Sequence, residues 1–177
     1  MTVDFRLPDE AALLEFFAYL FPRDKETGCY KVSGTNDVGR LLIAYARTTD
    51  KPAAEASSGT GHPVRLELPL SHLTQGLSGK WLYYSAPDTL RIIAALRAVF
   101  NIDFRSYYLA GLSRDYGKKE TIEMYIVSRG FVQADPYEAL HKRVYRAEQK
   151  RMSRLTAQLL RKARYFEESL DLSEMPQ

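Results

Sequence analysis

The sequence is poor in the residues that build disulfides, metal sites and membrane spans. Its one cysteine, Cys29, has no partner for an intrachain disulfide, which suits a reducing compartment. The three histidines, His62, His72 and His141, are scattered and show neither an H-E-x-x-H motif nor Cys/His ligand spacing. No apolar run approaches the roughly 20 residues that cross a bilayer, and Met1–Pro8 lacks the charged and apolar regions of a secretory signal. We therefore expect a cytoplasmic protein with no metal, no cofactor and no membrane contact.

Motifs for catalysis and for nucleotide binding are also missing. Gly59–Gly61 does not fit the G-x-x-x-x-G-K-[ST] phosphate loop, and Gly34–Gly39 has two glycines but neither a lysine nor a third glycine. Tyr107 and Tyr108 have arginines nearby, as a nucleophilic tyrosine would, but the further residues of such enzymes are not found, and core packing explains both rings better. The sequence therefore predicts no catalytic residue. An enzyme whose site carries no known motif is the third hypothesis.

The composition is that of an ordinary globular protein. With 177 residues, of which 45% are hydrophobic and 12% aromatic, the chain can bury enough apolar surface to fold as one domain, or as a domain with an extension. Its twelve tyrosines suit half-buried seams and interfaces, because each has an apolar ring and one polar tip.

The most apolar stretch is Ser85–Phe100, which we predict to be a helix. Ser85 and Asp88 have the spacing of a capping box, in which side chains satisfy the free N–H groups of the first turn. From Leu90 onward only two arginines interrupt the apolar residues. A helix that is apolar nearly all round belongs in the middle of a core, so we expect other elements to cover it on several sides.

Hydrophobic periodicity predicts a mainly α fold with about six helices. The predicted helices cover residues 9–21, 38–48, 85–100, 104–112, 119–129 and 136–170. Asn101 and Asp103 separate the third from the fourth. Residues 38–48 could also form a strand, but the i,i+4 spacing of Leu41 and Tyr45 favours a helix.

A small β element is predicted near residues 64–84, where Val64, Leu66 and Leu68 alternate with charged side chains. Residues 50–63 have little to bury and are predicted to be a mobile loop. The predicted organisation is a globular helical domain over 1–135, an amphipathic basic helix over 136–170 and a tail over 171–177.

The last predicted helix carries an unbalanced positive charge. Between His141 and Arg164 there are nine Lys and Arg residues and one acid, Glu148, which gives a net charge of +8 against +3 for the whole chain. On a helical projection the apolar residues gather in one sector: Leu140, Val144, Met152, Leu155, Leu159, Ala163 and Phe166. The cations of the other side are Arg143, Arg146, Lys150, Arg154, Arg161 and Arg164. Because such a row can neutralise phosphates and release counterions, we predict a nucleic-acid-binding surface there.

Two other interpretations of this helix stay open. The cations could form a solvated face, or a docking surface for an acidic protein. A helix of this length spans about 50 Å, so it could project and pair with a second copy, with Glu148 and Arg151 bridged beside the apolar sector. The leading hypothesis is a non-catalytic accessory protein that binds nucleic acid. The alternative is a protein-interaction or homodimerisation module.

Overall fold

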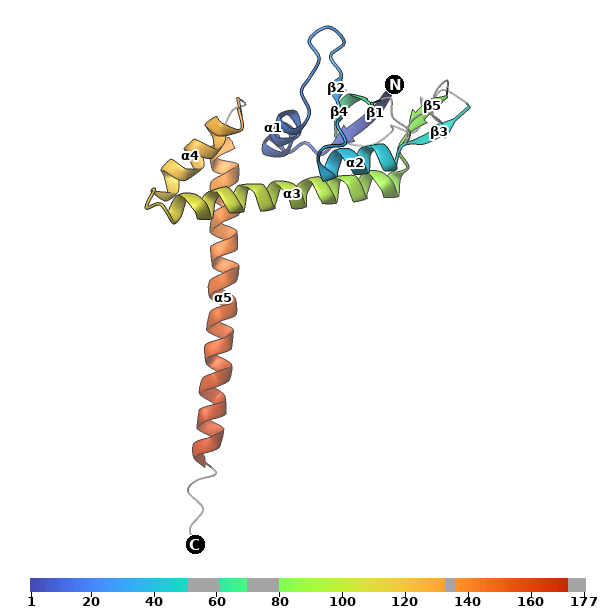
Figure 1. The fold of residues 1–177 in the computed structure, drawn as a ribbon. Helices are drawn as coiled ribbons and strands as arrows, with labels where there is room; N and C mark the ends of the chain where they lie inside the picture. The colour runs from blue at the N-terminus through green and yellow to red at the C-terminus, as the bar shows by residue number, and fades with distance from the viewer. Residues whose placement is uncertain (51–60, 70–79, 133–135, 172–177) are drawn as a thin grey trace. The chain divides into compact units, whose positions relative to one another are not determined.

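The computed structural model describes residues 1–50, 61–69, 80–132 and 136–171, with side chains up to residue 161 (Figure 1). The described part of the chain is mainly helical, as predicted. The chain divides into two units, Met1–Pro136 and Tyr137–Gln177, which we describe separately.

The first unit alternates short strands with helices. Its elements are, in chain order, β1 (Thr2–Leu7), α1 (Ala11–Leu20), β2 (Tyr30–Lys31), α2 (Asp37–Ala44), β3 (Arg47–Thr49), β4 (His62–Glu67), β5 (Trp81–Tyr83), α3 (Ala86–Leu112) and α4 (Lys118–Ser128). The second unit is formed by α5 (Pro136–Asp171), which begins at the last residue of the first.

Two small sheets are present among the described residues. In the larger one β4 is central: it pairs antiparallel with β1, from Thr2↔Glu67 to Leu7↔His62, and parallel with β2. In the smaller one β3 and β5 pair antiparallel. Alternate residues of β1, namely Val3, Phe5 and Leu7, are buried, which follows from the twofold alternation of side chains along a strand.

The β structure differs from the sequence predictions in three respects. Strands β4 and β5 lie near the predicted element at 64–84, but they belong to different sheets, and β1 was not predicted. The predicted mobile loop over 50–63 is wrong at its end, because His62 and Pro63 pair with Leu7 and Arg6 of β1. Residues 51–60 of that loop lie outside the described residues.

Helix α2 confirms the preference for helix over strand, but it ends earlier than predicted. The Asn36 side chain accepts a hydrogen bond of 2.7 Å from the Gly39 N–H and so caps its first turn. After Ala44 the chain extends, and Arg47 to Thr49 pair with β5 instead of continuing the helix.

Helix α3 is continuous where two helices were expected, so the described residues hold five helices and not six. Its buried residues follow each other every four positions through the predicted break: Ile92, Leu96, Phe100, Phe104 and Tyr108. Asn101 is exposed and Asp103 accepts a hydrogen bond from Tyr125 of α4, so neither polar side chain interrupts the buried row.

The expectation that α3 is covered on several sides is wrong within the described residues. Leu90 and Ile102 are 68% and 66% exposed, and Ala94 and Ala98 are exposed as well. Small alanine side chains leave little apolar area in water, so one buried row is enough. In this row Phe100 packs against Phe16 of α1, with ring centroids 4.9 Å apart.

Helix α4 packs against the C-terminal part of α3. Helices α1 and α2 and the strands lie along the preceding part of α3 (Figure 1). Helices α3 and α4 approach closely where Gly111 of α3 meets the buried side chain of Thr121 of α4. The rings of Phe104 and Tyr125 meet edge to face with centroids 5.0 Å apart. This contact buries the apolar side of α4.

Candidate functional site

The predicted nucleic-acid-binding residues lie along α5. Arg146, Lys150, Arg154 and Arg161 are exposed, and Arg143 is half-buried. We call these five residues the cationic stripe. Arg164 belongs to the helix, but its side chain lies outside the described residues. Because the helix rises 1.5 Å per residue, the stripe extends over about 22 Å between Arg146 and Arg161.

Near the start of α5 a basic side chain is paired with an acid. There the Lys142 ammonium lies 3.7 Å from the Glu138 carboxylate, one turn earlier. From residue 141 to residue 161 the sequence has a single acid, Glu148. The stripe therefore produces a positive potential along the greater part of the described helix.

The side of α5 opposite the stripe is apolar and largely exposed. Met152, Leu155 and Leu159 are 62%, 42% and 66% exposed in the single chain, and Val144 is half-buried. We call these four residues the apolar row. Successive positions 100° apart place the row roughly opposite the cationic stripe on the helix.

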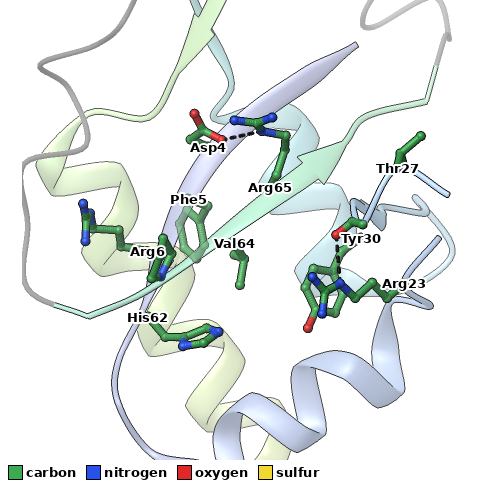
Figure 2. Close-up of a pocket in the computed structure, with 11 residues that line it drawn as sticks. Asp4, Phe5, Arg6, Arg23, Thr27, Tyr30, His62, Val64 and Arg65 are labelled. Carbon is green, nitrogen blue, oxygen red and sulfur yellow. Dashed lines mark hydrogen bonds and ion pairs between the residues drawn. The ribbon is translucent and has the colours of Figure 1, made fainter. Parts of the chain in front are cut away.

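A polar cleft of about 410 Å³ lies in the first unit (Figure 2). It is bordered by β1, by the first half of β4 and by the turn that leads into β2. Its charged side chains are Asp4, Arg6, Arg23 and Arg65, to which His62 adds an imidazole.

The turn beside this cleft is held by one carboxylate. Asp24 Oδ1 accepts the N–H groups of Glu26 and Thr27 at 2.9 and 3.0 Å, and Asp24 Oδ2 lies 2.6 Å from Lys31 Nζ. The hydrogen bond from Lys31, with the two backbone N–H donors, holds the pKa of Asp24 well below its usual range. The turn is therefore fixed by charge-assisted hydrogen bonds.

Arg23 is fixed by the same turn. Its Nε donates a hydrogen bond of 2.9 Å to the carbonyl oxygen of Gly28, and its guanidinium lies 5.8 Å from the Tyr30 ring centroid. Gly28 has φ of +68°, a left-handed conformation that glycine adopts without strain. Arg23 is thus held at the edge of the cleft by groups on both of its sides.

Two further carboxylates are bound within the fold. Asp88 is buried and accepts hydrogen bonds from Ser85 and from Arg47, whose Nη2 lies 2.7 Å away; these bonds lower its pKa. Asp103 accepts two hydrogen bonds from Arg129, at 2.8 and 3.0 Å, and one from Tyr125 at 2.9 Å. These pairs tie α3 to β3 and to α4, which is a structural role.

Sequence reasoning missed the cleft. Arg6, Arg23 and Arg65 come from three segments, so no spacing along the chain marks them as neighbours. The alternation in β4 placed Arg65 on an exposed face, but its partner strand β1 was not predicted. His62 falls within the loop predicted over 50–63, whereas the structure places it, still exposed, in β4 at the cleft.

Two other kinds of site are absent from the part of the chain that the structure describes. In that part no group of three or more His, Cys, Asp or Glu residues is placed to hold a metal ion. Nor is any of its helices long and apolar enough to cross a membrane.

Comparison of the chain with protein-family models, with characterised proteins and with solved structures found no match.

Proposed function

We propose that this protein is a non-catalytic nucleic-acid-binding protein that uses the cationic stripe of α5. The observation that supports the proposal is the line of exposed cations on one side of a helix that carries a single acid from residue 141 to residue 161. An ordinary solvated surface mixes both signs of charge, and this one does not.

The spacing of the stripe suits a phosphate backbone. Neighbouring cations are three or four residues apart between Arg143 and Arg154, which corresponds to steps of about 4.5–6 Å. Each cation that neutralises a phosphate releases counterions, so four contacts give a log–log salt slope of roughly −3 to −4. Because backbone contacts carry no sequence information, we expect little preference among sequences.

Charge reversal tests the stripe. The variant combines Arg146→Glu, Lys150→Glu and Arg154→Glu, and the control reverses three exposed cations of the first unit, Lys25→Glu, Arg105→Glu and Arg114→Glu. Both variants change the net charge equally. Fluorescence anisotropy with a labelled 20-base-pair duplex at several salt concentrations measures the affinity, and circular dichroism checks helicity.

We expect the stripe variant to lose binding at every salt concentration, while the control stays within a few-fold of the unaltered protein. Equal weakening in both variants would show that net charge alone attracts the duplex. Tight binding that ignores salt would also contradict the proposal.

The exposed apolar row favours a second function, self-association through α5. Burial of Met152, Leu155 and Leu159 against a second copy would remove apolar area from water, at about 25 cal/mol per Å². Pairing through this row would leave the cationic stripes on the two outer sides, where about 20 Å separates them, more than twice the Debye length at physiological salt. The two functions are therefore compatible.

Sedimentation equilibrium tests self-association. We expect the full chain to dimerise at micromolar concentration and Leu155→Glu to be monomeric. The matched control is Leu90→Glu, at a position of α3 that is 68% exposed. A full chain that is monomeric at 100 µM rules out pairing at working concentrations. If Leu155→Glu and Leu90→Glu weaken dimerisation equally, the weakening is due to the added surface charge.

A further inference from the structure

We propose that the polar cleft of the first unit binds a phosphate group. Its volume of about 410 Å³ falls within the range of small-molecule sites, roughly 300–1,000 Å³. The cleft belongs to a different unit from the cationic stripe and shares no residue with it. The inference is thus independent of the function proposed for α5.

The charge of the lining favours an anion. Three arginines line the cleft, and the one acid among the lining residues is Asp4. This carboxylate is already bound, because its Oδ1 accepts a hydrogen bond of 2.9 Å from Arg65 Nε. The lining thus has three arginine charges against one carboxylate, and a concave wall concentrates that positive field.

Arg23 is prepared for a phosphate by its fixed position. Its Nε is used by the Gly28 carbonyl, so the terminal nitrogens of the guanidinium carry the remaining donors. A planar pair of N–H donors matches two phosphate oxygens and binds them in a bidentate manner. Since the Gly28 carbonyl, in the turn that Asp24 fixes, already binds the Arg23 side chain, little conformational entropy is lost on binding.

Cations flank the cleft on two sides. Figure 2 shows Arg23 beside Tyr30 on one side of β4 and Arg6 on the other, while His62 lies at the start of β4. Arg6 Nη1 donates a hydrogen bond of 3.3 Å to the Gly61 carbonyl, which directs this side chain along the edge of the sheet. Arg65 stands between them on β4, next to its partner Asp4.

The shared chemistry is the phosphate group, and it has two possible sources: a small phosphate ester or the backbone of a nucleic acid. The first titration therefore uses inorganic phosphate at constant ionic strength, with chloride as the reference anion. The second uses a short single-stranded oligonucleotide without a terminal phosphate. Two-dimensional NMR follows the amides of Thr27 and Gly28 and the Nε–H of Arg23.

The main variant is Arg23→Gln, and its control is Arg40→Gln. Arg40 is a matched control because it is exposed, lies outside the lining and donates a comparable Nε bond of 3.1 Å to the Gly34 carbonyl. Loss of a charge-assisted bidentate contact should weaken binding about tenfold or more. A second variant, Arg65→Gln, tests the same site should Arg23→Gln fail to fold.

We expect saturable shifts with inorganic phosphate that chloride does not produce, weakened by Arg23→Gln and by Arg65→Gln and unchanged by Arg40→Gln. Shifts that only the oligonucleotide produces, with the same dependence on Arg23, would assign the site to backbone phosphates. Equal shifts with phosphate and chloride, or equal weakening by Arg23→Gln and Arg40→Gln, would overturn the proposal.

Discussion

The close contact between α3 and α4 gives a quantitative prediction at Gly111. A Cβ atom at this position would overlap Cγ2 of Thr121, and it would lie 2.8 Å from Oγ1 and 3.2 Å from Cβ of the same residue. Thr121 cannot easily turn away, because its side chain is buried and its hydroxyl donates a hydrogen bond of 2.9 Å to the Gly117 carbonyl. The substitution Gly111→Ala must therefore strain the contact.

Two opposing effects decide the magnitude. Overpacking of this kind costs about 1–3 kcal/mol, whereas alanine in place of glycine gains up to ~1 kcal/mol of helix propensity. The gain is small here because Gly111 is the residue before the last of α3. We expect the free energy of unfolding to fall by about 1–2 kcal/mol, which lowers the melting temperature by several degrees.

A double-mutant cycle with Thr121→Ala tests the cause. This second substitution removes both Cγ2 and Oγ1, so only the 3.2 Å approach to Cβ would remain. In that background Gly111→Ala should be nearly neutral, which corresponds to a coupling energy of about 1–2 kcal/mol in urea unfolding. An equal cost of Gly111→Ala in both backgrounds would refute the steric explanation.

Two further predictions concern stability. Leu96→Ala in the buried row of α3 should lower the free energy of unfolding by about 2–5 kcal/mol. Leu90→Ala, at a 68% exposed position, should change it by no more than ~0.5 kcal/mol in urea unfolding. Similar losses of stability in the two variants would show that the buried row is not the core. Because the folded-state pKa of Asp24 lies below its value in the unfolded chain, its contribution is complete above about pH 5 and is lost as the pH falls toward the folded-state pKa. Asp24→Asn should remove that part of the acid dependence between about pH 5 and 2, and an unchanged pH profile of the urea midpoint would show that the carboxylate does not stabilise the turn.

The helices that could be predicted from the sequence are those whose apolar residues recur at helical spacing. The predictions over 9–21 and 119–129 differ by one or two residues from α1 (Ala11–Leu20) and α4 (Lys118–Ser128). The error in α3 has a physical reason. Asn101 and Asp103 look like a break in one dimension, but Phe100 and Phe104 continue the buried row on the other side of the helix.

The sheet was harder to predict because strands need partners that are distant in sequence. Val3, Phe5 and Leu7 alternate with polar residues, and this alternation is the local signal for β1. The pairing with β4, some 60 residues later, leaves no mark on local periodicity. The same limit applies to the polar cleft, whereas the cationic stripe lies on one helix and needs only composition and spacing.

The position of Pro63 affects how the molecule behaves at high concentration. Leu68 N–H donates to the Met1 carbonyl, so even-numbered residues of β4 direct their backbone groups to β1, and odd-numbered ones direct theirs to the side of β2. Strand β2 pairs only with Leu66 and Glu67, and beyond it Pro63 has no N–H to offer to an incoming strand. A proline at this point of a sheet edge hinders strand addition by another molecule, and thus protects the first unit against edge-to-edge aggregation.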